Sequence, residues 1–209
     1  MCLFVGRPTN KVSFTVARPS NADLRRRQIA AALARLLPIT GFRGASTKAI
    51  AKEAGLSAGL VHHHFSSKLE ILVAVVEELA ETLTSRVPVG PLAPRARIHA
   101  QIDAWLAPGA GATPSAVAGW AAIGAEAVRH EAVAQVYRSA VRAQIDSLTE
   151  ALQAAAPHHS EGEARALAAI IQATIEGSFR LHMSAPGAIP DGRAASTLRA
   201  MVDAWLDAT

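Results

Sequence analysis

The abundance of alanine is the feature that most narrows the folds open to this chain. Of its 209 residues, 46 are alanine, whereas aromatic residues make up only 4%. Alanine has the highest helix propensity, and strands favour the β-branched and aromatic residues that are scarce here. Half of the residues are hydrophobic, enough to bury a large core. The composition therefore excludes a chain that is disordered throughout and predicts an all-α fold.

The cysteine content and the apolar runs indicate the compartment. Cys2 is the single cysteine, so the chain can form no internal disulfide and has no thiolate cluster for zinc. Apolar runs such as residues 71–76 fall far short of the ~20 residues that cross a bilayer. The apolar block at residues 2–5 is too short for a secretory signal. We expect a cytoplasmic protein without a cofactor.

Charge is distributed unevenly along the chain. Residues 1–68 contain eleven Lys or Arg and two acidic residues, a net charge of +9. Residues 69–209 contain ten basic and fifteen acidic residues, a net charge of −5. Such asymmetry favours an N-terminal part that faces a polyanion and is joined to a neutral or acidic body, although a solvated basic face without a partner remains the alternative.

Start and stop signals predict nine helices. Residues 1–20 lack a helical period and are expected to form a disordered N-terminal extension. The first helix follows an N-cap at Asn21 or Asp23 and ends near Ile39 or Thr40, because Pro38 disrupts its last turn and Gly41 permits a positive φ. The other expected helices span residues 47–54, 58–64, 68–87, 92–106, 114–129, 131–156, 161–184 and 193–208.

The second and third expected helices form a helix-turn-helix motif. Ser46 and Ser57 cap them, and Gly55 lies in the short turn between them, an arrangement that presents the second helix to the major groove of DNA. The predicted core residues are Ile50, Ala54, Leu56, Val61 and Phe65. The residues expected to point outward are small, polar or basic, as DNA contacts require: Thr47, Lys48, Ser57, Ala58, Gly59, His62 and His63.

This segment resembles the TetR family of bacterial transcriptional repressors. The residues that carry the resemblance are Gly41, Thr47, Ile50-Ala51, Ala54-Gly55-Leu56-Ser57, Gly59, His64-Phe65, Lys68 and Leu72. Residues 24–80 match closely, whereas the rest matches in helix number and length. Residues 120–126 are weakly similar to the BetI-like branch.

The resemblance implies roles for individual residues. Thr47 and Lys68 would contact phosphates, and Lys48 would lie near a base edge. Groove-facing positions would be taken by Ala58, Gly59, His62 and His63. Two residues depart from the family pattern: His62 replaces a common tyrosine, and Pro38 replaces a residue that continues the first helix.

The C-terminal body is expected to bind an effector and a second copy of the chain. Helical bundles bind ligands between helices, among aromatic side chains with a few polar anchors. The predicted effector residues, for each of which a plain core role is the alternative, are Trp105, Trp120, Glu126, Phe179, His182 and Met183. The last two helices carry wide apolar stripes, and the resemblance implies that they pair with their copies in a homodimer.

Together these patterns predict a helix-turn-helix domain at residues 21–67 and a ligand-binding and dimerisation domain at residues 68–209. The expected function is a ligand-responsive repressor that binds a palindromic operator as a dimer and is released by a small molecule. Two alternatives stay open: an adaptor whose basic head engages a protein or membrane surface, and a small helical enzyme. No catalytic sequence motif favours the enzyme, and neighbouring histidines on a helix diverge by about 100°, so residues 62–64 do not predict a metal site.

Overall fold

The computed structural model describes residues 20–88, 90–107 and 113–208, so most of the expected N-terminal extension lies outside it. Within these ranges the chain is all-α, as predicted, and contains nine helices. They are α1 (Asn21–Gly44), α2 (Thr47–Ala54), α3 (Ala58–His64), α4 (Lys68–Ser85), α5 (Pro94–Leu106), α6 (Pro114–Ala127), α7 (Glu131–Ala155), α8 (Glu161–Ser184) and α9 (Arg193–Leu206). None of these helices is both long and apolar enough to cross a bilayer.

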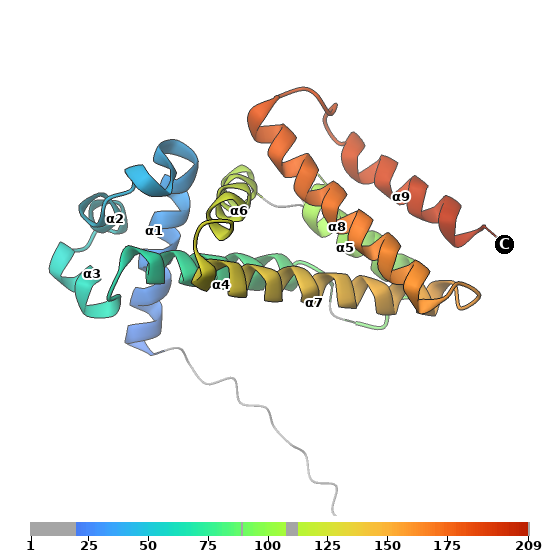
Figure 1. Ribbon diagram of the computed structural model, residues 1–209, viewed down its shortest axis with the longest axis horizontal. Helices are drawn as coiled ribbons and strands as arrows, with labels where there is room; N and C mark the ends of the chain where they lie inside the picture. The colour runs from blue at the N-terminus through green and yellow to red at the C-terminus, as the bar shows by residue number, and fades with distance from the viewer. Residues whose placement is uncertain (1–19, 89, 108–112, 209) are drawn as a thin grey trace, which may run out of the picture.

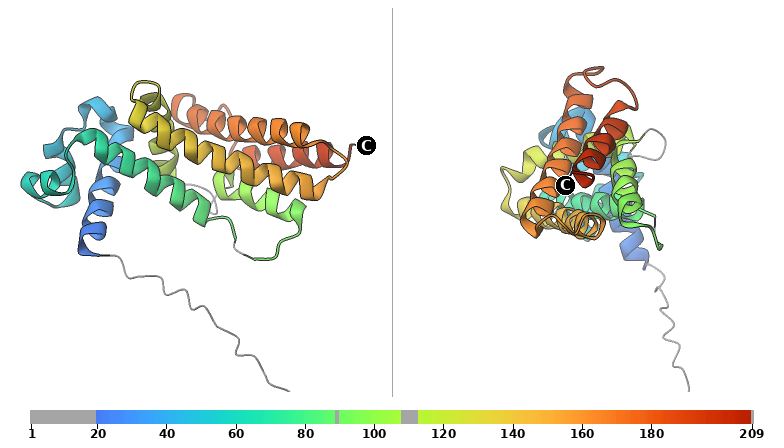
Figure 2. Two further views of the ribbon diagram at one scale, coloured as in Figure 1. Left: turned by 60° about the horizontal axis from the view of Figure 1, so that its bottom comes forward. Right: turned by 90° about the vertical axis from the view of Figure 1, so that its right-hand side faces the viewer.

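The helices form a small head joined to an elongated body (Figure 1). The head contains α1, α2 and α3, and α4 leaves it to run into the body, where it packs against α7. Helix α8 lies against α7, and α9 packs against α5. Seen from two further directions, the long helices run along the body, and the C-terminus lies at the end opposite the head (Figure 2). The DNA contacts predicted for the head and the effector contacts predicted for the body are therefore separated along α4.

The sequence predicts the interruption of α1 after Thr40 but not the turn that follows it. The helix passes through the exposed Pro38, as a predicted end near Thr40 requires, and a further turn extends it to Gly44. Its regular geometry is interrupted at Gly41, which has φ 65° and ψ 172°. Gly41 thus provides the predicted positive φ, but the chain then makes one more turn that buries Phe42. Burial of this phenylalanine explains why the helical turn forms after the glycine.

One continuous hydrophobic core joins the head and the body. In the head, Ile50, Ala54, Val61 and Phe65 are buried as predicted, and Leu56 is partly buried against them. Helix α6 packs on α1 and α4 so closely that a Cβ atom at Gly119 would lie 3.3 Å from Cδ1 of Leu79. The domain boundary expected near residue 68 therefore does not separate two cores, because the hydrophobic core continues across it.

Two glycines of the helix-turn-helix motif differ in backbone conformation but not in the space around them, so their substitution isolates the effect of backbone strain. Neither Gly55 nor Gly59 has an atom within 4 Å of an added Cβ, but only Gly55 has a positive φ, of +67°. We predict that Gly55→Ala lowers the free energy of unfolding by about 1 kcal/mol, whereas Gly59→Ala leaves it unchanged or raises it by about 0.5 kcal/mol. Urea unfolding of both variants measures this difference, and equal effects would contradict it.

Candidate nucleic-acid interface and effector cavity

Local hydrogen bonds shape the turn between α2 and α3. The Ser46 hydroxyl accepts a bond from the amide of Ala49 at 3.1 Å, and the Ser57 hydroxyl accepts one from the amide of Leu60 at 3.2 Å. Each serine thus satisfies one free amide at the start of its helix. Gly55 ends α2 in the left-handed conformation, and the amide of Leu56 donates to the carbonyl of Ala51 at 2.9 Å. The chain therefore turns sharply and starts α3 immediately.

The start of α3 presents an open surface of small residues. Ala58 and Gly59 are exposed, and so are His62 and His63 one turn later. In the same motif Lys48 and Ser57 are exposed, and Thr47 is partly buried. This surface offers little steric obstacle to a partner, together with hydroxyl, imidazole and ammonium groups that can bind phosphates or base edges.

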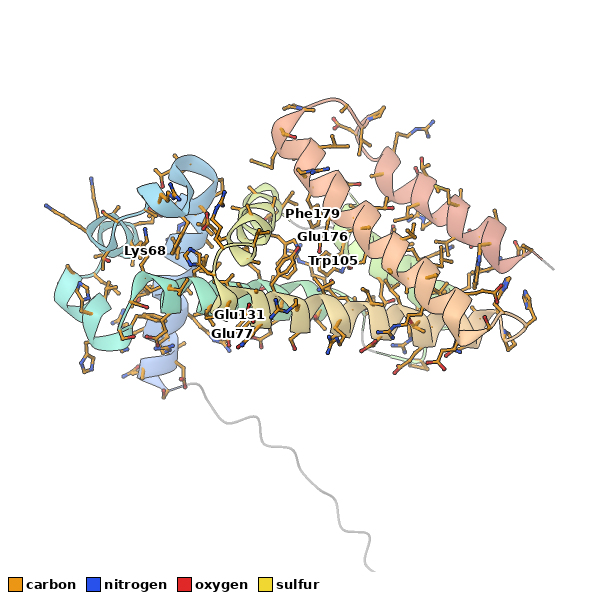
Figure 3. The ribbon with its side chains drawn as sticks, in the orientation of Figure 1. Lys68, Glu77, Trp105, Glu131, Glu176 and Phe179 are labelled. Atoms are coloured by element: carbon orange, nitrogen blue, oxygen red, sulfur yellow. The ribbon has the colours of Figure 1, made fainter. Side chains whose placement is uncertain are left out.

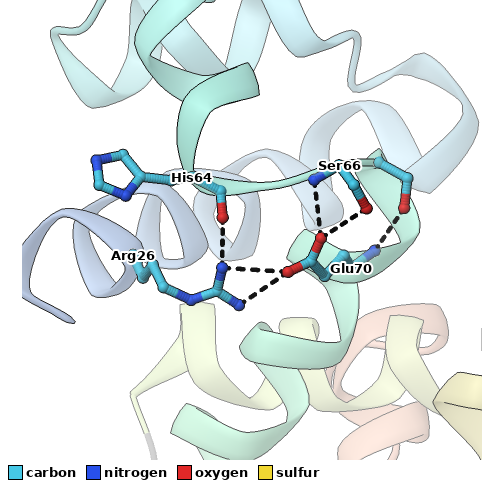
Figure 4. Close-up of polar contacts among 5 residues, drawn as sticks. Arg26, His64, Ser66 and Glu70 are labelled. Carbon is cyan, nitrogen blue, oxygen red and sulfur yellow. Dashed lines mark hydrogen bonds and ion pairs between the residues drawn. The ribbon is translucent and has the colours of Figure 1, made fainter. Parts of the chain in front are cut away.

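Arg26 of α1 holds the far end of α3 in place (Figure 4). Its guanidinium donates to the carbonyl of His64 and, at 3.1 Å, to Glu70 of α4, and it lies 4.0 Å from the centre of the Phe65 ring. Glu70 also accepts bonds from the amide and hydroxyl of Ser66, both at 2.8 Å. We call Arg26, His64, Ser66 and Glu70 the Arg26 clamp. It joins α1, the end of α3 and the start of α4 in one polar network.

Two further side chains of α1 hold α2. The Gln28 amide donates to the carbonyl of Ala54 at 2.7 Å, which satisfies a free acceptor at the end of α2. Arg35 pairs with Glu53 at 2.6 Å. Helix α1 therefore orients both helices of the motif.

Lys68 occupies an unexpected environment for a predicted phosphate contact. Its ammonium donates to the carbonyl of Phe42 at 2.6 Å and lies 4.4 Å from the centre of the Phe42 ring. It is partly buried where the head meets α4 (Figure 3). Lys68 therefore joins the end of α1 to the start of α4, and its contact with DNA stays a prediction.

Glu126 lies near the head rather than among the predicted effector residues. Its side chain is 14% exposed and lies 3.6 Å from Arg129 and 3.5 Å from His130. The His130 ring in turn makes an edge contact with Phe42, with 5.8 Å between the ring centres. Glu126 thus belongs to the corner between α6 and α7 that contacts α1.

The predicted aromatic residues of the body do come together. Trp105 stacks on Phe179 with 6.0 Å between ring centres and meets Trp120 edge-on at 6.2 Å. Trp105 and Phe179 lie near Glu176 in the middle of the body (Figure 3). All three aromatic side chains are buried, with Trp120 only 1% exposed. Their cluster forms the apolar centre between α5, α6 and α8.

A cavity of about 530 Å³ lies beside this cluster. Helices α4, α5, α7 and α8 supply its lining, which includes the predicted Trp105 but also residues that the sequence analysis missed. These are Ala80, Glu81, Thr84, Ser85, Val87, Gln101, Ile102, Ala140, Ala143, Gln144, Ser147, Leu148, Gln172 and Ile175. One sequence signal could have pointed to this cavity, namely a glutamine among the isoleucines of α8. This residue, Gln172, is only 3% exposed.

A second cavity, of about 670 Å³, also borders Trp105. Phe179 and His182 line it, whereas Met183 is 43% exposed outside its lining. Trp120 and Glu126 line neither of these two cavities. The predicted effector residues are therefore divided between the aromatic cluster, the second cavity, the surface and the corner beside the head.

A partly buried polar chain reaches the first cavity through Gln172, the one member of the chain that lines it. The Tyr137 hydroxyl donates to Glu176 at 2.6 Å, and the amide of Gln172 donates to the other oxygen of Glu176 at 3.1 Å. Burial, followed by the bond to Glu176, raises the pKa of Tyr137 well above its ordinary value. The phenol therefore stays protonated and acts as a donor, which holds Glu176 and Gln172 in fixed positions.

Comparison with known families places both parts of the chain. Residues 29–75 match the family described as bacterial regulatory proteins, tetR family, and residues 94–207 match the C-terminal part of BetI-type transcriptional repressors. The transcriptional regulator PksA of Bacillus subtilis is 43% identical over 65 residues, which cover 31% of this chain and 32% of that protein. The regulator BetI of Rhizobium meliloti is 31% identical over 137 residues, which cover 64% of this chain and 67% of that protein.

Solved structures are similar over most of the chain. A transcriptional regulator from Rhodococcus sp. Rha1 has a TM-score of 0.74 and 27% identity, covering 86% of this chain and 94% of that one. A transcriptional regulator from Saccharomonospora viridis, solved in complex with choline, has a TM-score of 0.71 and 19% identity, covering 87% and 95%.

The Arg26 clamp predicts how stability depends on pH. Hydrogen bonds from the amide and hydroxyl of Ser66, and then Arg26, lower the pKa of Glu70 below its ordinary 4.5. A lowered pKa stabilises the fold above pH 4.5, and this contribution is lost as the pH falls through the folded pKa. Glu70→Gln should therefore lower the melting temperature at pH 7, by a modest amount because both charges are partly exposed.

The measurement is thermal unfolding of both proteins between about pH 7 and pH 3.5. The gap between their melting temperatures should narrow in the acidic range. A gap that is constant over the whole range would contradict the role of the ionised carboxylate. Glu77→Gln, at an exposed position on the same helix, is the control.

Proposed function

Because this chain belongs to the TetR family, as a ligand-responsive DNA-binding transcriptional repressor with a BetI-type C-terminal part, we propose how its own residues carry out that function. Two copies form a homodimer, and each places α3 in the major groove at one half-site of a near-palindromic operator. A small molecule bound in the 530 Å³ cavity releases the dimer from DNA. A repressor must reach its DNA operator, so the proposed site of action is the cytoplasm.

The exposed start of α3 is the observation that carries this proposal. At Ala58 and Gly59 almost no side chain separates the helix backbone from a partner, so it can approach base edges closely. Lys68 has three N–H donors, of which the carbonyls of Phe42 and Arg43 take two, so one remains for a phosphate. The proposed DNA contacts are Thr47, Lys48, Ser57, Ala58, Gly59, His62, His63 and Lys68.

An apolar face of α8 supports the dimer. Ile170 and Leu181 are 59% and 38% exposed, and between them an added Cβ at Gly177 would meet nothing within 4 Å. The hydroxyls of Thr174 and Ser178 donate to carbonyls of their own helix. An apolar partner can therefore cover these two hydroxyls without breaking their hydrogen bonds. On α9, Met201 is 61% exposed. Such a face of small and apolar residues suits close packing against its copy.

Helix α4 supports the link between effector and operator. Glu81, Thr84 and Ser85 line the cavity, and Lys68 at the start of the same helix binds the end of α1. A ligand that binds one position of α4 more tightly than another would change the spacing of the two heads. Choline is the ligand of the Saccharomonospora viridis structure. At 19% identity, the similarity to that structure supports a shared fold and not a shared ligand.

DNA binding is tested by mobility shift on the DNA upstream of the gene. Lys48→Ala should change base preference and weaken the best operator by about 1 to 3 kcal/mol, whereas Lys68→Ala should weaken all sequences alike. Arg142→Ala, which removes an exposed cation from α7, is the control. Equal losses on all sequences for both lysines would refute the assigned roles, and failure to bind any duplex at low salt would refute DNA binding.

The dimer is tested by a charge placed on the open face of α8. Ile170→Glu should convert the dimer to monomer in sedimentation, because pairing would bury an unpaired carboxylate. Val128→Glu is the matched control, since Val128 is 87% exposed on a different element. A dimer that survives Ile170→Glu would remove α8 from the interface.

A further inference from the structure

Two glutamines that line the first cavity have amide oxygens without hydrogen-bond partners within the described part of the chain. Oε1 of Gln101, on α5, is buried and unpaired, although the amide nitrogen of the same side chain donates to the Ser147 hydroxyl at 2.7 Å. Oε1 of Gln144, on α7, is also buried and unpaired. Both residues line the 530 Å³ cavity. A buried acceptor without a donor is unfavourable, so two of them in one cavity point to a ligand that donates.

The charges around the cavity restrict the ligand further. Among the described residues of its lining there is no Lys, Arg or His to neutralise an anion. The one ionisable group of the lining is Glu81, whose side chain is 67% exposed and lies 3.7 Å from Arg27. A ligand carboxylate would therefore meet unpaired acceptors and another carboxylate. Neutral and cationic ligands escape this repulsion.

The rest of the lining suits an apolar body. Ile102, Trp105, Leu148 and Ile175 are all buried in the fold and border the cavity. One amide proton of Gln172 is not available to a ligand, because it is donated to Glu176. The cavity thus combines apolar walls with acceptors from two different helices.

We propose that the effector is an amphipathic molecule without negative charge that donates N–H or O–H hydrogen bonds to Oε1 of Gln101 and of Gln144. This inference rests on the proposed function, in which the cavity is the effector site. A molecule that donates to both oxygens connects α5 with α7 while its apolar body touches Trp105, Leu148 and Ile175. A quaternary ammonium head without N–H protons lacks this interaction.

Four probes with the same octyl chain test the donor requirement. Octanamide and octylamine carry N–H donors, octyltrimethylammonium carries a charge without donors, and octanoate carries only acceptors. In thermal unfolding of the full chain, octanamide and octylamine should raise the melting temperature, because they bind the folded state. The other two should leave it unchanged. Equal stabilisation by octanoate or octyltrimethylammonium, or no shift with octanamide and octylamine, would overturn the proposal.

Substitutions locate the bonds. Gln101→Leu and Gln144→Leu should each weaken octanamide binding by about tenfold, as the loss of one hydrogen bond predicts. Gln135→Leu, at an exposed position on α7, is the matched control. Unchanged affinity in the double variant would also overturn the proposal. Mobility shift of the same preparations without probe separates the two questions, because intact operator binding leaves the proposed function standing when the donor requirement fails.

Discussion

The orientation of α3 depends on the bonds that Arg26 makes. A helix of seven residues is too short to be stable alone, so contacts outside it must hold its position. Arg26 supplies them by binding the carbonyl of His64 at the end of α3, the carboxylate of Glu70 on α4 and the face of Phe65. Together with the buried Val61 and Phe65, this network fixes the direction of the open surface at the start of α3 relative to α1 and α4.

The same region connects the head to the body by two routes. Lys68 joins the start of α4 to the carbonyl of Phe42, and the Phe42 ring contacts His130 at the corner between α6 and α7. The other end of α4 lines the proposed effector cavity through Glu81, Thr84 and Ser85. Since the core is continuous from head to body, a displacement of α4 cannot stay confined to the cavity. This continuity supports the proposed link between ligand binding and DNA binding.

In the proposed effector site, the sequence predicted the aromatic residues but not the cavity. Aromatic residues near a few polar groups predicted the cluster of Trp105, Trp120 and Phe179, and the structure confirms their proximity. It did not predict the cavity beside them, because the polar lining comes from α5, α7 and α8, whose glutamines are far apart in sequence. Glu126 is close to Trp120 along the chain but contacts His130 instead, because successive turns of α6 face different neighbours.

Local sequence determined the helices of this protein and the helix-turn-helix motif, because caps, glycines and apolar spacing act within a few residues. It also determined which residues of α3 face outward, since the buried positions repeat with the helical period. Tertiary structure alone decided that Lys68 binds the end of α1, that a further helical turn follows Gly41, and that two glutamines with unpaired oxygens line one cavity. These features arise from packing between distant helices, which no local pattern encodes.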